Sequence, residues 1–299
     1  MRRVTTEEYI NFIKTHDSVE IENITVKLQK SWNITRYQPE NYRPEEWTVW
    51  SFPDRGDWAT HIGNYRGNWS PYVPRNLIDR YTKPGDLVCD PMMGSGTTLV
   101  ECKLMGRNAI GIDINPDAVM VAMNRLDFQY KPLDTSYIEP KIELFVGDAR
   151  NLDAIENSAV DLIATHPPYS GIIPYTKSAV SGDLSSLSLE EFMNAMGKVA
   201  EEFHRILKDG GHCALLIGDT RKHRHYVPIH IGVLGKFLDA GFVLKEEIIK
   251  LQHRTKTTRE RWAGHKYDFY KIAHEHLYVF RKLLKEERRQ DFKYSMKWW

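Results

Sequence analysis

The feature that most constrains the fold is a glycine turn between an apolar run and a helix-like segment. The turn reads Asp90-Pro-Met-Met-Gly-Ser-Gly-Thr-Thr98; the apolar run 87–89 precedes it, and residues 97–105 have a helical pattern. Where a parallel strand is followed by a helix, glycines let the backbone approach a ligand closely. The crevice beyond the strand ends is where α/β sheets bind cofactors. We therefore predict an α/β fold whose first strand ends in a ligand-binding loop.

The alternation of strand-like and helix-like runs continues along the chain. Seven strand-like runs with intervening helices are typical of a doubly wound, mostly parallel, Rossmann-like sheet. Five of the runs end at Asp90, Asp113, Asp148, His166 and Asp219, and two span 242–251 and 277–283. Capping boxes at Thr5–Glu8 and Ser188–Glu191 predict two helix starts, and the glycines of Asp209-Gly-Gly211 are expected to stop the second helix.

The sequence divides into three parts. Residues 1–57 interrupt the alternation and are expected to form an N-terminal appendage, with strand-like spacing at 19–28. Residues 58–283 carry the alternation and form the main domain, and 284–299 make a basic tail that ends in two tryptophans. A chain of 299 residues is long enough for one large α/β domain with additions or for two small domains.

Composition excludes some classes of protein. The three cysteines Cys89, Cys102 and Cys213 are far apart, which indicates reduced, inert thiols in a cytosolic protein. No apolar run approaches the ~18 residues that span a bilayer, so no membrane association is expected. The formal net charge of +1 means that any evidence for nucleic-acid binding has to come from local patches.

Two acids indicate what the glycine turn binds. A dinucleotide site needs a third glycine where this chain has Leu99, and no Gly-Lys-Ser/Thr phosphate loop follows. Asp113 suits the two hydroxyls of a ribose, and Asp148 is expected to accept from an adenine amine. A ribose and an adenine without a pyrophosphate describe S-adenosylmethionine. The alternative is that Gly94 and Gly96 only make a tight turn and that the acids cap helices.

A second motif, Thr165-His-Pro-Pro-Tyr169, follows a later strand-like run. Two prolines fix the backbone, and an aromatic ring follows them. The amine of a nucleobase is a poor nucleophile because its lone pair is delocalised, so an enzyme that methylates it must accept hydrogen bonds from it. A rigid carbonyl and the preceding side chain offer two acceptors, and Tyr169 is placed to stack on a flipped base. The alternative is a Pro-Pro turn with a core tyrosine.

These two motifs resemble those of the DNA amino-methyltransferases, which methylate cytosine N4 or adenine N6 with S-adenosylmethionine. The segment Trp69-Ser-Pro-Tyr-Val-Pro-Arg-Asn-Leu-Ile78 is similar to the motif that closes over the methionine end of the cofactor in that family. The resemblance covers roughly residues 58 to 283, with the cofactor motif before the catalytic motif. The catalytic positions it implies are His166, Pro167, Pro168 and Tyr169. The cofactor-binding positions are Trp69, Ser70, Asp90, Pro91, Met92, Gly94, Gly96, Thr97, Asp113, Ile114, Asp148 and Ala149.

His166 departs from the family pattern, which has Asp, Asn or Ser at this position. A neutral imidazole has one ring nitrogen that accepts, so His166 is a candidate acceptor for the amine. Alternatively, Asp183 or Asp219 supplies that contact and His166 only shapes the pocket. The absence of a carboxylate or amide at His166 favours cytosine N4 slightly over adenine N6.

Two basic segments are candidates for contacting double-stranded DNA. Residues 253–276 interleave basic and aromatic side chains, which suits phosphate contact and stacking, and 220–227 add charge after another strand-like run. The candidate DNA-contacting residues are Arg221, Arg224, Arg254, Lys256, Arg259, Arg261 and Trp262. The alternative is that both segments are solvated charged faces.

Other functions remain open at this point. Enzymes that methylate RNA guanine N2 or a protein glutamine amide use similar Pro-Pro-Tyr loops, and a catalytically silent nucleic-acid binding module would retain the same fold. The histidines, His230 and His276 among them, show no metal-ligand spacing, so no metal is expected. The resemblance implies a prokaryotic cytoplasmic enzyme for which a cognate restriction enzyme is a candidate partner.

Overall fold

The computed structural model describes residues 1–21, 24–65, 67–132, 137–168, 182–253 and 268–297. Its strands are β1 (Arg2–Val4), β2 (Ser18–Ile21), β3 (Ile24–Lys27), β4 (Val49–Ser51), β5 (Leu87–Asp90), β6 (Asn108–Asp113), β7 (Ile142–Val146), β8 (Val160–Thr165), β9 (Leu207–Ile217), β10 (Thr220–Lys222), β11 (His225–Val227), β12 (Val243–Leu251) and β13 (His274–Arg281). Its helices are α1 (Thr6–Thr15), α2 (Tyr72–Tyr81), α3 (Thr97–Met105), α4 (Pro116–Leu126), α5 (Leu189–Ile206) and α6 (Ile229–Asp239), with short 3-10 turns η1 (Leu184–Ser186) and η2 (Arg289–Ser295).

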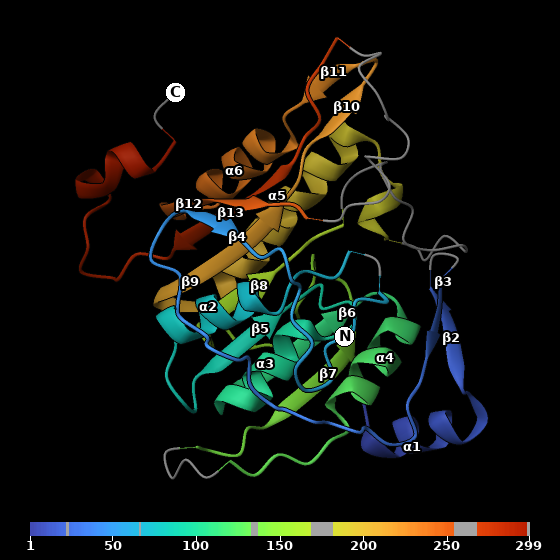
Figure 1. Cartoon of the computed structure of the whole chain (residues 1–299). Coiled ribbons are helices and arrows are strands. Elements are labelled where there is room, and N and C mark those ends of the chain that lie inside the picture. Colours follow the sequence, from blue (N-terminus) through green and yellow to red (C-terminus); the bar gives the residue numbers. More distant parts are fainter. Residues whose placement is uncertain (22–23, 66, 133–136, 169–181, 254–267, 298–299) are drawn as a thin grey trace.

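Most strands belong to one mixed sheet with the order β1-β7-β6-β5-β8-β9-β13-β12-β4 (Figure 1). The five strands from β7 to β9 pair in parallel, and β13 runs antiparallel between β9 and β12. The α/β class is therefore confirmed. In the described chain the sheet has nine strands instead of the seven expected, because β1 and β4 from residues 1–57 pair with β7 and β12 at its two edges.

Residues 1–57 are thus joined to the main domain by strand pairing in addition to the covalent backbone. The spacing at 19–28 forms the hairpin β2–β3, whose Val19, Ile21 and Val26 pack on Ala118 of α4. Both capping boxes are confirmed, at the start of α1 and at the start of α5.

The predicted helix stop at Asp209-Gly-Gly211 is wrong. Helix α5 ends at Ile206, and the two glycines lie inside β9. Gly210 has φ +80°, and a Cβ on Gly211 would lie 2.9 Å from the Lys208 carbonyl oxygen. Glycine inside a strand marks an irregular pairing, and the register between β8 and β9 shifts between Val160 and Leu162. The glycines therefore allow a bend in the strand instead of stopping the helix.

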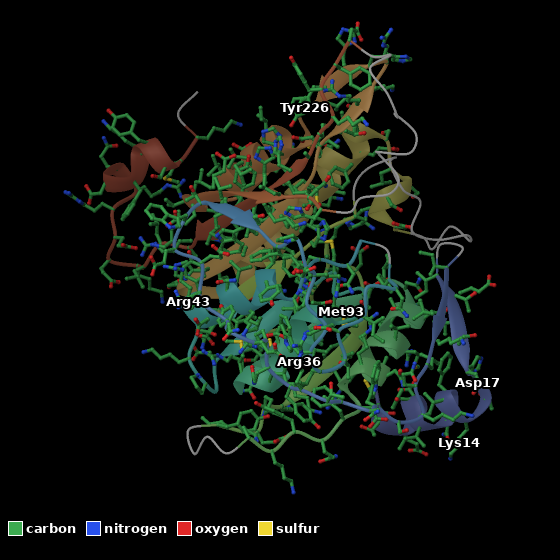
Figure 2. All side chains as sticks on the ribbon, in the orientation of Figure 1. Lys14, Asp17, Arg36, Arg43, Met93 and Tyr226 are labelled. Carbon is green, nitrogen blue, oxygen red and sulfur yellow. The ribbon has the colours of Figure 1, made fainter. Side chains whose placement is uncertain are left out.

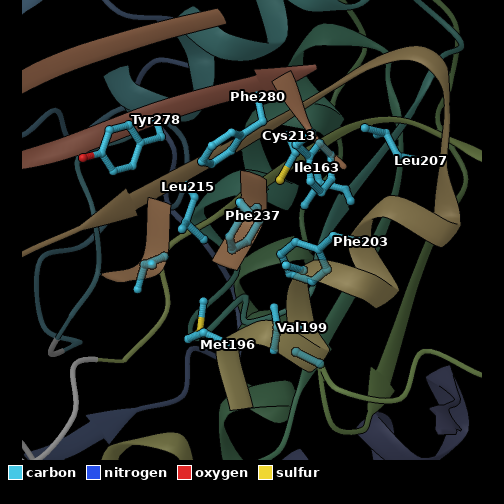
Figure 3. Packing of buried hydrophobic residues seen from close by; sticks show 14 of the residues in the cluster. Ile163, Met196, Val199, Phe203, Leu207, Cys213, Leu215, Phe237, Tyr278 and Phe280 are labelled. Atoms are coloured by element: carbon cyan, nitrogen blue, oxygen red, sulfur yellow. The ribbon is translucent and has the colours of Figure 1, made fainter. Parts of the chain in front are cut away.

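The core on one face of the sheet lies between β8, β9 and β13 and the helices α5 and α6 (Figure 3). Phe203 of α5 and Phe237 of α6 are fully buried there, and the Phe237 ring stacks on Phe280 of β13 with centroids 4.9 Å apart. A second core on the opposite face joins α2 and α3 to β5 and β6 through residues such as Leu77 and Leu99. Helices on both faces make the sheet a doubly wound one.

This topology brings the carboxyl ends of β5, β6, β7 and β8 to one edge, where ligands bind in open α/β sheets. The four strands are followed there by the segments at Asp90, Asp113, Asp148 and His166. Within the residues described, no helix combines the length and the apolar character needed to cross a lipid bilayer.

Candidate active-site cleft

A cleft of about 870 Å³, partly open to solvent, lies at the carboxyl ends of these four strands. Nine of the twelve predicted cofactor positions line it: Trp69, Asp90, Pro91, Met92, Gly94, Asp113, Ile114, Asp148 and Ala149. The cleft also contains His166 and Pro168 from the predicted catalytic motif. The two motifs, about 70 residues apart in the sequence, thus share one cavity.

Asp90 at the end of β5 anchors the floor of the cleft. Its carboxylate accepts hydrogen bonds from the hydroxyls of Thr98 at 2.5 Å and Thr165 at 2.8 Å, so it links α3 and β8 to β5. Burial is the main reason that its pKa is raised to about 7, although those hydrogen bonds oppose the rise. Asp90 is therefore a largely enclosed anchor that presents only part of its surface to a ligand.

Asp113 at the end of β6 holds the glycine turn. One carboxylate oxygen accepts from the Gly94 N–H at 2.9 Å, and the other accepts from the Asn115 N–H at 2.9 Å. Burial raises its pKa to about 6 against the effect of these backbone donors. Each carboxylate oxygen has a further lone pair, so the residue retains the capacity to accept from two hydroxyls.

Glycine is required at two positions of the turn, for different reasons. Gly94 has φ +51°, and a Cβ there would lie 3.1 Å from the ring of Tyr65, so the backbone and the aromatic ring approach each other across the cleft. Gly96 has φ +80°, and a Cβ there would lie 2.9 Å from the Cβ of Ala122 in α4. Gly94 therefore shapes the cavity, and Gly96 allows helix packing behind it.

The three remaining cofactor positions do not line the cleft. Gly96 faces α4, the Thr97 hydroxyl donates to the side-chain oxygen of Asn68, and the Ser70 hydroxyl donates to the Arg55 carbonyl at 2.8 Å. Arg55 in turn donates to the Trp69 carbonyl at 2.9 Å. These residues hold the walls of the cleft in place.

Asp148 at the end of β7 is already engaged. Its two carboxylate oxygens accept from the guanidinium of Arg150, with nitrogen–oxygen distances of 2.5 to 3.0 Å. Arg150 also donates to the Gly182 carbonyl at 3.0 Å, which attaches the segment before η1 to the cleft. The adenine contact that the sequence predicts for Asp148 therefore has to share this carboxylate with Arg150.

His166 lies at the end of β8 with its side chain 12% exposed. Its ring stacks on Trp69, with centroids 6.0 Å apart and 23° between the planes. Burial is the main cause that lowers the pKa of His166; Glu275, 3.9 Å away, opposes the shift, and the Lys250 ammonium adds to it. The ring is therefore neutral at physiological pH and has one nitrogen able to accept a hydrogen bond.

The two acids that are alternatives to His166 as amine acceptor, Asp183 and Asp219, lie in different surroundings. Asp183 lines the cleft and is buried, and one of its oxygens accepts from the backbone and the hydroxyl of Ser185. Asp219 is not among the described residues that line the cleft, and it accepts from the Tyr226 hydroxyl and the His230 backbone N–H. Tyr169 lies outside the described residues, so its predicted stacking role stays a prediction.

Sequence reasoning did not assign Tyr65 and Asn68 to the cleft, although both line it. Both lie in the aromatic, glycine-rich stretch before α2. Arg125 of α4 fixes this stretch because its guanidinium donates to Ser95 at 2.7 Å and to Asn64 at 2.8 Å. The clustering of aromatic and glycine residues was the available signal, but it does not indicate which of them face a ligand.

Two of the seven predicted DNA-contacting residues are described. Arg221 and Arg224 lie on or beside the hairpin β10–β11, which extends away from the sheet (Figure 1). In Figure 2 Tyr226 marks this hairpin, well separated in the view from Met93 of the glycine turn. Arg254, Lys256, Arg259, Arg261 and Trp262 lie outside the described residues.

The residues present fit S-adenosylmethionine. The glycine turn leaves space where a Cβ at Gly94 would meet Tyr65, and Asp113 offers acceptor capacity at the edge of the cleft. One other acid of the lining, Asp183, suits a ligand with cationic groups. The fold and the cleft thus define an α/β protein with a nucleoside-type ligand site next to a rigid, His-Pro-Pro substrate loop.

Two protein-family models match this chain. A family model described as DNA methylase, of N6- and N4-methyltransferases, matches residues 3–124 and 160–297. A second model, described as an RMKL-like methyltransferase domain, matches residues 80–223. The first match covers most of the chain, and the protein belongs to the DNA methylase family.

The individual relatives match only part of this chain. The chain is 45% identical over 65 residues to the Type II methyltransferase M.MjaII of Methanocaldococcus jannaschii, which is 22% of this chain and 12% of that protein. It is 29% identical over 194 residues to the tRNA (guanine(10)-N2)-dimethyltransferase of Methanothermobacter thermautotrophicus, which is 64% of this chain and 48% of that protein. These alignments thus span about half or less of the relatives' length. A solved SAM-dependent methyltransferase from Methanosarcina mazei has a TM-score of 0.48 and 16% identity, with 70% of this chain and 98% of that chain covered.

Proposed function

We propose that this protein transfers a methyl group from S-adenosylmethionine to the exocyclic amine of a DNA base that is flipped out of the duplex. One observation carries the proposal. The neutral imidazole of His166, on a loop fixed by Pro167 and Pro168, lines the same cleft as the acid-lined glycine turn. Membership of the DNA methylase family supports it.

The cofactor supplies an electrophilic methyl group when it is bound. Asp113 is proposed to accept from the ribose hydroxyls, because both of its oxygens are already oriented by backbone donors and keep free lone pairs. Asp183 adds a further acid to the same cavity. Trp69 and Tyr65 contribute aromatic surface to the lining of the cleft.

His166 is proposed to accept a hydrogen bond from the target amine. This contact draws the amine nitrogen away from conjugation with the ring, so that its lone pair becomes available. Burial keeps the imidazole neutral, and the Trp69 ring limits its rotation. Tyr169 is proposed to stack on the flipped base. Asp183 is the alternative acceptor within the cleft, and cytosine N4 is the slightly favoured target.

The duplex is proposed to contact the hairpin β10–β11 and the basic segment 253–276. Arg221 in the hairpin is held by its donation to the Tyr270 carbonyl at 2.7 Å, so the two segments are in contact where they are described. A prokaryotic cytoplasmic setting and a cognate restriction enzyme follow from the resemblance alone. If Arg254, Lys256, Arg259 and Arg261 each contact a phosphate, replacing all four by Ala lowers the salt slope of DNA binding by about 3.6.

Methylation of RNA guanine N2 is the second candidate, since the tRNA-modifying relative aligns with 64% of this chain. A transfer assay with radiolabelled S-adenosylmethionine separates the two. We expect label in double-stranded DNA and none above background in tRNA, with Tyr169→Ala as the inactive control. Label in tRNA alone would assign the protein to the second function.

A further inference from the structure

Three residues that the proposed chemistry does not use converge on the far side of the sheet from His166. Asp219 follows β9, His230 lies in the first turn of α6, and His276 lies near the start of β13. Alternation along β13 sends His276 towards α6, while Glu275 points to the opposite face, where it lies 3.9 Å from His166. The group is therefore separate from the cleft.

The donor atoms of this group face one another at short range. One carboxylate oxygen of Asp219, Oδ2, lies 2.5 Å from Nδ1 of His230 and 3.6 Å from Nε2 of His276. The side chain of Asp219 is 1% exposed, and those of His230 and His276 are 13% and 9% exposed. All three donor atoms lie within 4.8 Å of one another.

The hydrogen bonds around the group fix which nitrogen of His276 is available. Glu247 lies 2.9 Å from Nδ1 of His276, so Nδ1 carries the proton and donates to this carboxylate. Nε2 is then the ring nitrogen that faces Asp219, 3.6 Å from its Oδ2. Nε2 is buried and has no hydrogen-bond partner among the residues described. A metal ion placed between Nε2 and Asp219 would be bound by both groups.

We propose that Asp219, His230 and His276 bind a transition-metal ion of the Zn²⁺ class. Imidazole nitrogen and carboxylate oxygen are preferred ligands of Zn²⁺, and three protein ligands leave a fourth position for water. A tetrahedral ion with bonds of about 2.0 Å separates its ligand atoms by about 3.3 Å, so the pair at 2.5 Å has to open by less than 1 Å. Glu247 orients His276 as carboxylates commonly do for metal-binding histidines.

Metal binding changes one local feature. The rings of His230 and His276 are stacked 3.7 Å apart with 1° between their planes, and a metal lies in the plane of each ring that binds it. At least one ring therefore tilts when the ion binds. The Tyr226 hydroxyl donates to Asp219, so the ion connects the hairpin β10–β11 to α6 and β13. This site departs from the expectation of no metal and does not depend on the proposed methyl transfer.

The test uses the full chain, stripped with a chelator and then given Zn²⁺ alone or Co²⁺ alone. We expect one retained equivalent of Zn²⁺ per chain and the visible absorption of tetrahedral Co²⁺. Replacing His230 or His276 by Gln should remove both signals, and His225→Gln, at an exposed hairpin histidine, should retain them.

Glu247→Gln keeps the test decisive if the His variants fail to fold, since the Glu247 side chain is 47% exposed. We expect this variant to bind Zn²⁺ about 10 to 100 times more weakly than the wild type. A wild-type chain that retains less than about 0.1 equivalent, or a folded Glu247→Gln chain with wild-type affinity, would overturn the proposal.

Discussion

Replacing Asp113 by Asn tests the cofactor site at its most defined point. The carboxylate accepts from two backbone N–H groups at 2.9 Å each, and its remaining lone pairs are assigned to the ribose. An amide keeps one oxygen, so one backbone N–H loses its partner and the negative charge disappears. A hydrogen bond to a charged group contributes about 1.5–3 kcal/mol, which predicts S-adenosylmethionine binding about 10- to 150-fold weaker.

The unpaired N–H has a separate effect on the apo protein. Leaving one buried donor unsatisfied costs about 1–3 kcal/mol, so the free energy of unfolding should fall by that amount. Calorimetric titration with S-adenosylmethionine measures the first effect, and thermal unfolding measures the second. Asp117→Asn is the matched control, because it changes the same charge four residues away and Asp117 is not in the cleft lining. Wild-type affinity in a folded Asp113→Asn protein, or equal loss in both variants, would refute the assignment.

Four further variants test the same geometry. Tyr169→Ala should leave S-adenosylmethionine affinity within about twofold while removing most methyl transfer; equal loss of binding and transfer would reassign Tyr169. His166→Asn should retain activity but lose the acid limb of the pH–rate profile, which the lowered pKa of His166 places below about pH 6.5. An unchanged acid limb would reassign His166. The pKa of Asp90 is raised from 3.8 to about 7, so the folded state holds the Asp90 proton more tightly than the unfolded state does, and the stability from this group is lost as the pH rises between those values. The free energy of unfolding of the wild type relative to that of Asp90→Asn should therefore fall over this pH window. A flat or rising difference in thermal melts would contradict the burial argument. Gly96→Ala should lower the free energy of unfolding by more than 1 kcal/mol, because φ is +80° and the new Cβ lies 2.9 Å from Ala122, and a double variant with Ala122→Gly should recover part of the loss; an unchanged melting temperature in Gly96→Ala would exclude the contact.

The sequence allowed the site to be predicted where chemistry follows the ends of parallel strands. Asp90, Asp113 and Asp148 are predictable because successive parallel strands end at one edge, whatever the details of packing. The edge strands β1 and β4 were not predicted, because three-residue strands lack a periodic pattern and form only against an existing sheet. The glycines in β9 were misread because the same residues end helices and permit irregular strand pairing.

Contacts between distant side chains were beyond the sequence. Nothing in the spacing of Asp219, His230 and His276 indicates that they meet, because their proximity depends on β13 lying beside β9 and on α6 starting above it. The pairing of Arg150 with Asp148 is similar, since local sequence does not show which partner a surface arginine takes. The packing role of Gly96 was not predicted either. The dinucleotide fingerprint places the close packing at the position of Leu99, whereas in this chain it is Gly96 that lies against Ala122 of α4.

The central claim is that the protein methylates an exocyclic amine in DNA, with S-adenosylmethionine bound at the glycine turn and the amine held by His166. The most direct test incubates double-stranded DNA with the full chain and S-adenosylmethionine and identifies the modified nucleosides by mass spectrometry. The account predicts N4-methylcytosine, with N6-methyladenine as the outcome that corrects only the choice of base. The absence of both from DNA, with a folded protein that binds S-adenosylmethionine, would contradict the claim.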